Sequence, residues 1–291
     1  MNSGVEVREV PVQRILNPTA IDLGDYVINP YLGCTYGCLY CYVRSNRVVS
    51  RKKAAWGSFV DVRVNACERL EKELVLRRPS VVLLGSTTEC FQPLEERFGL
   101  TGRILETLNR HGVGYVILTR SPGILAYRTL LAQGCCRRIY FTVNEYSQEF
   151  KEALEPRTPA FALRREAVNT LLADGVPVVP YFSPLLPGIS DYTTVFDWFP
   201  RARRIEFECL NFSLANIEAI IRAIAAVDPA LGARYDAMRR DKPDYSRVWQ
   251  EIQKNITAAA ARAGKSFAIH VHQFGGYFQN RYDPTDRRSP D

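Results

Sequence analysis

The chain has 291 residues, which is long for one domain and short for two, and its 46% hydrophobic content is enough for a large core. The net charge of +7 is modest for this length, so it fits an anionic small molecule or peptide as well as a nucleic acid. The N-terminus MNSGVEVREVPVQRILNP lacks the apolar core of a secretory signal, and no apolar stretch is long enough to span a bilayer. The eight cysteines have no regular disulfide-like spacing, so we expect a cytoplasmic protein with no membrane partner.

Short β-branched or apolar runs alternate with longer amphipathic segments along the chain. We expect strands over 26–29, 81–85, 115–119, 138–143, 176–182, 204–208 and 267–271. We expect helices over 65–78, 100–111, 124–133, 162–173, 215–227 and 245–263. Strands separated by helices form right-handed βαβ units, so the sequence predicts a parallel sheet.

Six such units predict an α/β fold with a partial, open (β/α)6 barrel, in a single domain over residues 1–280. The expected parts are an N-terminal arm over 1–25, a core barrel over 26–210, and C-terminal helices with a last strand over 211–280. Residues 281–291 are polar, and we expect a loose tail there.

A group of three cysteines follows the first expected strand. Cys34, Cys38 and Cys41 lie in NPYLGCTYGCLYCYVR with the spacing C-x3-C-x2-C. Thiolates this close on a glycine-bearing loop can hold three irons of a [4Fe–4S] cluster, which normally takes four thiolates. The fourth iron then stays open to a substrate or cofactor. The position also fits, because sites on such sheets lie at the carboxyl ends of strands.

Other uses of the three cysteines fit less well. Structural zinc needs a fourth Cys or His nearby, but the three histidines lie at 111, 270 and 272. A disulfide cannot use three cysteines evenly, and ferredoxins have the different run C-x2-C-x2-C. The other five cysteines form no second C-x2-C set, so we expect one cluster. An electron-transfer or redox-sensing cluster stays an alternative.

A basic run comes directly after the cysteine loop. Arg44, Arg47 and Arg51 to Lys53 precede Trp56 and Phe59. A basic stretch with nearby aromatic residues can follow a phosphate backbone. A solvated loop explains the run at least as well.

The cysteine motif resembles the signature of the radical SAM superfamily. Other segments, from about Ile15 to Pro187, resemble its spore photoproduct lyase-like branch: ILNPTAIDLGDYVINPYLGCTYGCLYCY, VRVNACERLEKEL, TTECFQPLEERFGLTGRILETLNRHGV, LTRSP, LEPRTPAFALRREAV and GVPVVPYFSPLLPGISD. The resemblance implies a [4Fe–4S] cluster on Cys34, Cys38 and Cys41, whose open iron chelates S-adenosylmethionine (SAM). It also implies an external electron donor such as flavodoxin or ferredoxin, and a 5′-deoxyadenosyl radical that abstracts hydrogen.

The resemblance implies further cofactor-binding residues. Tyr40 would lie by the adenine, and the segment 85–89, with Ser86, Thr88 and Glu89, would face the methionine part of SAM. Arg120, next to Thr119, would contact SAM. Thr142 and Asn144 would bind its ribose or carboxylate, and Arg164 or Arg165 would reach the same ligand. Plain packing, structural caps and surface salt bridges are the alternatives for these residues.

Two further residues are candidates for catalysis. The lyase returns a hydrogen atom from a cysteine, and Ser86 occupies that position here. A serine O–H is a poor hydrogen-atom donor because its bond is much stronger than S–H. Cys90 follows Glu89 closely and could donate hydrogen, hold a substrate or approach the cluster, although a lone cysteine is usually a small buried hydrophobe. Tyr42 resembles a tyrosine proposed to relay hydrogen, and could equally belong to the core.

The C-terminal stretch 267–277, FAIHVHQFGGY, carries two histidines. His270 and His272 share one face of the expected strand, so they could bind a metal or a substrate carboxylate. Structural histidines explain them better. Glu206 and Glu208 also share a strand face, followed by Cys209. Pointing inward they could bind a cationic substrate group, and pointing outward they would be solvated.

Two substrate classes follow. A small molecule, nucleoside or peptide is favoured slightly by Ser86 and by the modest charge. Nucleic acid is the alternative that the lyase resemblance implies, and a lesion would then be extruded from the base stack. A non-enzymatic redox sensor that binds DNA is a further alternative, but no helix-turn-helix is evident.

Overall fold

The computed structural model describes residues 4–276 and 279–285, and the chain divides into two compact units. The first unit comprises Met1–Gly37, Asn46–Phe141 and Arg157–Val178. The second comprises Cys38–Ser45, Thr142–Pro156 and Val179–Asp291. The boundary therefore crosses the cysteine loop between Gly37 and Cys38. The expectation of one continuous domain over 1–280 stays a prediction.

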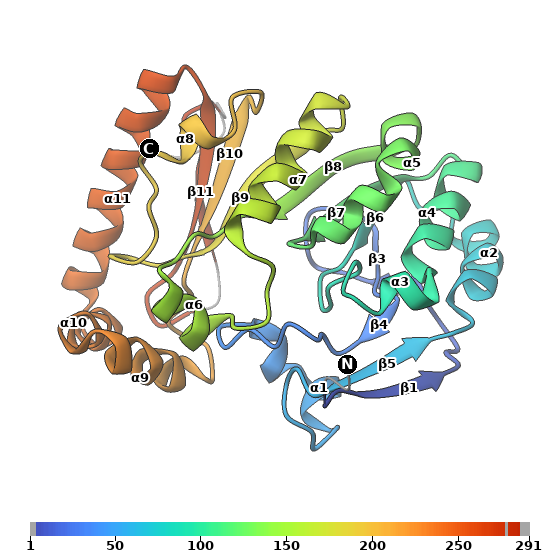
Figure 1. The fold of residues 1–291 in the computed structure, drawn as a ribbon, viewed down its shortest axis with the longest axis horizontal. Helices are drawn as coiled ribbons and strands as arrows, with labels where there is room; N and C mark the ends of the chain where they lie inside the picture. The colour runs from blue at the N-terminus through green and yellow to red at the C-terminus, as the bar shows by residue number, and fades with distance from the viewer. Residues whose placement is uncertain (1–3, 277–278, 286–291) are drawn as a thin grey trace. The chain divides into compact units, whose positions relative to one another are not determined.

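The main sheet of the first unit is built from strands with helices between them (Figure 1). Its order is β2-β3-β6-β7-β8, in which β2 is antiparallel to β3 and the other neighbours are parallel. The strands are β2 (Asn17–Pro18), β3 (Tyr26–Ile28), β6 (Val81–Leu84), β7 (Gly114–Thr119) and β8 (Cys136–Thr142). The helices are α2 (Ala66–Arg77), α3 (Glu95–Phe98), α4 (Leu100–Arg110), the 3-10 helix η2 (Pro122–Tyr127), α5 (Arg128–Gln133) and α7 (Phe161–Ala173). Helix α4 contacts α2, α5 and β7, and so covers one side of this sheet.

The first unit also contains a small sheet that the sequence analysis did not predict. Its order is β1 (Glu6–Val10), β5 (Phe59–Arg63) and β4 (Tyr31–Leu32), and the short helix α1 (Arg47–Ser50) precedes β5. Strand β1 is mostly exposed, so it lacks the alternation of apolar and polar residues that identifies a strand in sequence. Tyr31, Val60, Val62 and Leu100 form the core beneath β4 and β5.

The second unit holds a sheet of order β9-β10-β11-β12. The strands β9 (Val178–Leu185), β10 (Arg204–Cys209) and β11 (Ser266–His272) are parallel, and β12 (Gln279–Tyr282) is antiparallel. The helices are η1 (Tyr42–Ser45), α6 (Gln148–Leu154), α8 (Val195–Trp198), α9 (Ile217–Val227), α10 (Pro229–Arg240) and α11 (Lys242–Ala263). Figure 1 shows α11 alongside β11, which it contacts. Phe182 and Phe207 stack between neighbouring strands with ring centroids 5.3 Å apart.

The strands form an open arrangement. Within the described residues, β2 pairs with β3 and β12 pairs with β11, and neither has a partner on its other edge. The predicted α/β fold with parallel strands in a partial, open barrel is therefore confirmed. The seven expected strands correspond to β3 and β6–β11. The expected and observed bounds differ most for β9, which was expected to end at residue 182 and continues to Leu185. It contains two prolines, which interrupt the strand pattern in the sequence.

The expected loose tail over 281–291 is wrong for its first part. Arg281 and Tyr282 belong to β12, and the Asp283 carboxylate, 3% exposed, forms ion pairs with Arg204 at 2.6 Å and Arg281 at 2.8 Å. Burial alone would raise the pKa of Asp283, but hydrogen bonds from Arg204 and Thr285 hold it at about 2. Residues 286–291 lie outside the described part of the chain.

Candidate active site

The first half of the cysteine loop belongs to the first unit, where hydrogen bonds fix the backbone on both sides of Cys34. Thr35 donates its N–H to the side-chain oxygen of Gln92 at 3.0 Å, and Thr88 donates its hydroxyl to the Gly33 carbonyl at 2.5 Å. Gln92 links the two contacts, because its side-chain N–H lies 3.4 Å from the Thr88 hydroxyl. Gln92 is fully buried. Thr88 thus positions the loop, and its expected role in binding the cofactor stays a prediction.

Glycine is required within this half of the loop. Gly33 has φ +100°, and a Cβ there would lie 2.2 Å from the Phe59 carbonyl oxygen. Gly37 has φ +59°, and a Cβ would meet the Arg157 guanidinium, which donates to the Gly57 carbonyl at 2.7 Å. The loop therefore turns tightly around Arg157, whose role the sequence analysis missed.

The second half of the loop belongs to the second unit, and its backbone is also held. Leu39 donates its N–H to the Leu154 carbonyl at 2.8 Å, and the Leu39 carbonyl accepts the side-chain N–H of Asn216 at 2.5 Å. The Cys38 carbonyl accepts the Cys41 N–H at 3.3 Å and the Arg44 guanidinium at 3.4 Å. Each half of the loop is therefore fixed by residues of its own unit.

The three thiols suit an iron–sulfur cluster. None of the three cysteines forms a disulfide with a described residue; Cys34 and Cys38 are buried, and Cys41 is partly exposed. Across the described residues, no three Cys, His, Asp or Glu side chains converge on a single metal ion. Thiolates of a [4Fe–4S] cluster bind different irons, so they need not converge on one point. Three thiolates supply ligands for three of the four irons of such a cluster.

Tyr40 lies in a buried polar group of the second unit. Its hydroxyl contacts the Glu155 carboxylate, and Asn144 donates to it at 3.5 Å and to the Ser183 carbonyl at 2.8 Å. Tyr40, Asn144 and Glu155 are all buried, and so is Thr142 at the end of β8. The structure thus brings together Tyr40 and Asn144, which the sequence analysis assigned to one ligand, and adds Glu155, which it missed.

Glu89 connects the ends of β6 and β7. Its buried carboxylate accepts the Thr119 hydroxyl at 2.6 Å, the Arg120 N–H at 2.8 Å and the Phe91 N–H at 3.0 Å. Burial raises the pKa of Glu89, although these hydrogen bonds oppose the shift. Ser86, also buried, accepts a hydrogen bond from Asn29 at 3.4 Å. The expected contact segment therefore forms a rigid rim at the strand ends.

Cys90 is fully buried beside this rim. A Cβ on Gly85 would lie 3.3 Å from the Cys90 sulfur. Burial raises the pKa of the Cys90 thiol, and the charges of Glu89 and Glu95 raise it further. The thiol therefore keeps its proton at neutral pH.

The remaining predicted residues differ in exposure. Tyr42 is 54% exposed, so the alternative that it belongs to the core is wrong. Arg164 is buried on α7, whereas Arg165 is exposed, with its guanidinium 5.7 Å from the Phe161 ring centre. Of the aromatic residues after the basic run, Trp56 and Phe59 are both buried.

The two C-terminal histidines pair with the two strand glutamates. His270 lies 3.1 Å from Glu206, and His272 lies 3.4 Å from Glu208. Glu208 also accepts the Ser183 hydroxyl at 2.6 Å and the Tyr181 hydroxyl at 3.0 Å. Burial alone would raise the pKa of Glu208, but hydrogen bonds from His272 and Ser183 hold it at about 2. The Glu206 side chain is buried, whereas the Glu208 side chain is partly exposed. Of the stretch 267–277, Tyr277 lies outside the described residues.

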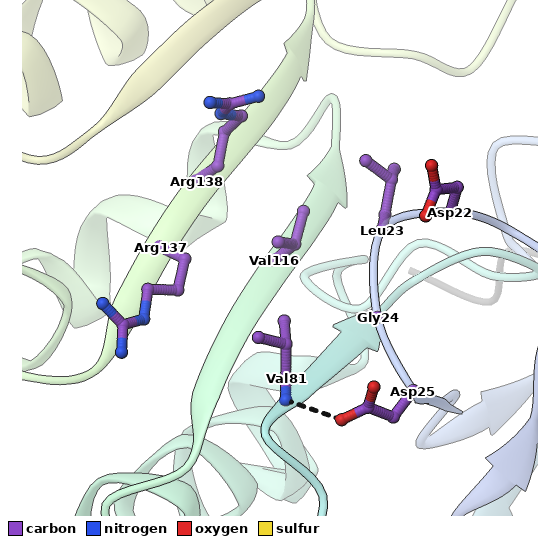
Figure 2. A pocket seen from close by; sticks show the side chains of 8 residues that line it. All are labelled: Asp22, Leu23, Gly24, Asp25, Val81, Val116, Arg137 and Arg138. Carbon is purple, nitrogen blue, oxygen red and sulfur yellow. Dashed lines mark hydrogen bonds between the residues drawn. The ribbon is translucent and has the colours of Figure 1, made fainter.

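A cavity of about 440 Å³ in the first unit lies at the wrong strand ends for this site (Figure 2). Its lining includes Val81 at the start of β6 and Arg137 and Arg138 near the start of β8. Asp25, in the same wall, accepts the Val81 N–H at 3.1 Å. The residues of the candidate site lie at the carboxyl ends instead, where α/β sheets bind ligands.

Comparison with known proteins identifies the class. The family model of the radical SAM superfamily matches residues 28–195, which is more than half of the chain. The chain belongs to the radical SAM superfamily and is an enzyme of the class that uses a [4Fe–4S] cluster and SAM. An electron donor and a substrate are therefore required.

The chain is also similar to particular proteins. An uncharacterized protein of Methanocaldococcus jannaschii is 29% identical over 217 residues, covering 74% of this chain and 82% of that protein. A Mycobacterium tuberculosis relative is 27% identical over 200 residues, covering 65% of this chain and 58% of that protein. A spore photoproduct lyase mutant with bound AdoMet and dinucleoside spore photoproduct has TM-score 0.64 at 14% identity, covering 90% of this chain and 80% of that chain. The predicted resemblance to the lyase-like branch is confirmed at the level of the fold.

No helix in the described part of the chain is long and apolar enough to cross a membrane. The cytoplasmic location stays a prediction.

Proposed function

We propose that this radical SAM enzyme abstracts hydrogen from a small molecule, nucleoside or peptide, and does not perform the lesion-splitting reaction of spore photoproduct lyase. The observation that carries the proposal is the buried Ser86 at the end of β6, whose hydroxyl accepts a hydrogen bond from Asn29. A serine hydroxyl is a poor hydrogen-atom donor, so a lyase-type return of hydrogen from this position is unavailable.

The chain's own residues have separate tasks in this proposal. Cys34, Cys38 and Cys41 hold the cluster, which together with SAM supplies a 5′-deoxyadenosyl radical when reduced. Asn144, fixed on the Ser183 carbonyl, and the neighbouring Tyr40 hydroxyl orient the nucleoside part of SAM. The rim that Glu89 fixes excludes water and keeps the reacting carbon close.

Cys90 is the proposed hydrogen donor to the product radical. Its pKa is raised by burial, so the sulfur carries its proton at neutral pH. It also lies one residue from Glu89, on the same rim. Tyr42, exposed next to Cys41, is the proposed relay.

The second unit offers a polar group for binding a substrate. Ser183, Glu208 and His272 lie at the carboxyl ends of β9, β10 and β11, and they form one hydrogen-bonded group. Ligands of α/β sheets bind at these ends. The group therefore supports a substrate with hydroxyl or amino groups rather than an apolar one.

Nucleic acid repair or modification is the second candidate. It is favoured by the similarity in fold to a lyase whose solved structure holds a dinucleoside spore photoproduct. Binding to nucleic acid would weaken steeply with salt, because phosphate contacts release counterions.

The first experiment reconstitutes the cluster without oxygen, adds dithionite and SAM, and measures 5′-deoxyadenosine by mass spectrometry. We expect the product in the parent protein and its loss in Cys34→Ala, Cys38→Ala and Cys41→Ala. Cys67→Ala, a partly exposed cysteine outside the loop, should keep full activity. No product from a protein with an intact cluster and bound SAM would contradict the proposal and favour the redox sensor.

The same assay separates the reactions. Cys90→Ala should retain iron and SAM cleavage but leave the substrate radical unquenched, so that solvent deuterium no longer enters the product through an exchangeable thiol. Conversion of dinucleoside spore photoproduct to thymidines by the parent protein would instead establish the lyase reaction.

A further inference from the structure

The segment around the cysteine loop has an unusual charge distribution. Residues 26–60 contain five basic side chains and no Asp or Glu. These five positive charges compare with a net charge of +7 for the entire chain. All five follow Cys41, so a large part of the excess positive charge lies directly after the cluster-binding cysteines.

Most of these cations have no carboxylate partner, whereas several cations elsewhere on the surface have one. Arg110 pairs with Glu71, Arg239 with Glu218, and Arg247 with Asp244. In the basic run, Lys52 pairs with Asp61. Arg47, Arg51 and Lys53 are exposed and form no ion pair with any described residue. Their charges are therefore directed to solvent.

An apolar side chain lies within this charged surface. Val48, on α1 between Arg47 and Arg51, is 53% exposed, whereas Val49 is buried and anchors the helix. We call Arg47, Val48, Arg51 and Lys53 the α1 patch. An apolar centre with a charged rim is the usual anatomy of a transient protein–protein interface.

The α1 patch is close to the cluster along the chain. Arg47 follows Cys41 by six residues, so their Cα atoms lie at most about 23 Å apart even in a fully extended chain. The 3-10 helix η1 and the turn before α1 shorten this path. The patch is therefore joined to the third cluster cysteine by a short segment of chain.

We propose that the α1 patch is the docking surface for an acidic one-electron carrier protein that reduces the cluster, and this inference rests on the proposed function. One electron passes from the carrier to the cluster, so the carrier is oxidised by one electron and the cluster is reduced by one. The positive charges attract the carrier, and Val48 contacts its surface.

A carrier protein fits the patch better than nucleic acid does. Trp56 and Phe59, the aromatic residues that follow the basic run, are 9% and 3% exposed, so they offer no platform for base stacking. The patch spans one helix of four residues and the turn after it. That size suits a small, transient electron-transfer contact rather than a groove that follows several phosphates.

The test compares two reductants in one variant. The variant Arg47→Glu, Arg51→Glu, Lys53→Glu reverses the patch, and a matched variant reverses three exposed cations elsewhere, Arg14→Glu, Lys242→Glu and Arg262→Glu. An acidic flavodoxin, kept reduced, is the probe. We expect its rate of cluster reduction to fall roughly tenfold or more in the patch variant at low salt, and to lose its salt dependence. The matched variant should keep the parent rate, and both should keep dithionite-driven formation of 5′-deoxyadenosine.

Binding of oxidised flavodoxin to the cluster-free protein, measured by calorimetry, gives a readout that does not need activity. Weaker binding in the patch variant alone supports the docking surface. An equal loss of flavodoxin binding in the two variants would overturn the docking surface, because net charge alone would then explain the binding. Loss of DNA binding with an unchanged flavodoxin rate would overturn it in favour of a nucleic-acid surface. Absence of dithionite-driven product in the parent protein would contradict the proposed function, while the binding measurement would still test the patch.

Discussion

Thr35 donates its backbone N–H to the side-chain oxygen of Gln92 at 3.0 Å, one residue after the first cluster cysteine. Fifty-seven residues separate the two partners in sequence. Because Gln92 also reaches Thr88, whose hydroxyl holds the Gly33 carbonyl, one buried side chain fixes the chain on both sides of Cys34.

Replacing Gln92 by leucine should therefore weaken the cluster site. The Thr35 N–H, which is half-buried, would lose its partner, at a cost of about 1 kcal/mol. We expect fewer irons per chain after reconstitution and a lower urea midpoint for the cluster-free protein. Gln92→Glu keeps an oxygen for Thr35 and should lose less. Normal iron content and an unchanged urea midpoint in Gln92→Leu would show that the hydrogen bonds of Gln92 are not needed to hold the chain around Cys34.

Asn216 offers a matched pair of variants for the second half of the loop. Asn216→Asp removes the N–H that donates to the Leu39 carbonyl. A carboxylate oxygen then lies next to the carbonyl oxygen, and the two acceptors repel each other. We expect a loss of about 1–2 kcal/mol in unfolding free energy and faster loss of the cluster in air. Asn211→Asp is the control, because Asn211 uses its oxygen to accept the Ser213 N–H, and aspartate keeps that oxygen. Equal cluster lifetimes in the two variants would contradict the prediction.

Glu208 should make stability depend on pH in the acid range. Its pKa is about 2 in the folded protein against an ordinary value of 4.5. A lowered pKa stabilises the fold above pH 4.5, and this stability is lost as the pH falls from 4.5 towards 2. The difference between these two pKa values corresponds to about 3 kcal/mol, at 1.36 kcal/mol for each pKa unit.

Urea unfolding of the cluster-free protein at several pH values tests this. Glu208→Gln should flatten the curve between pH 4.5 and 2, whereas Glu152→Gln, an exposed glutamate, should leave the slope as it is. A slope that persists in Glu208→Gln would assign the effect to other carboxylates, with Asp283 the first to examine because its pKa is also about 2.

Much of the fold could be predicted because its signals are local. Each buried parallel strand, such as 81–85 or 115–119, is a short apolar run that its neighbours in sequence do not obscure. Strand β1 and helix α10 escaped prediction for the opposite reason. The side chains of β1 are mostly exposed. Helix α10 is joined to α9 through Asp228 alone, and only three of its residues are buried, Gly232, Tyr235 and Met238.

The candidate site was predictable only where a motif marks it. Cys34, Cys38 and Cys41 are fixed by spacing, and Tyr40 follows from its place before the last cysteine. Cys90 and the two histidines were identified as candidates from the sequence, but the residues that they contact were not. Their partners, Glu206 for His270 and Glu208 for His272, depend on the register of β10 against β11.

The sequence by itself determined the class of chemistry, because three thiolates within eight residues need no tertiary structure to be neighbours. It also determined the alternation of strands and helices, which depends on local periodicity. The tertiary structure alone decided which distant side chains hold the loop. Gln92 and Asn216 contact it across 57 and 177 residues, and Glu155 reaches Tyr40 across 115. The position of a polar side chain in the sequence does not identify its hydrogen-bond partner. The partner is determined only when folding brings the loops at the strand ends together.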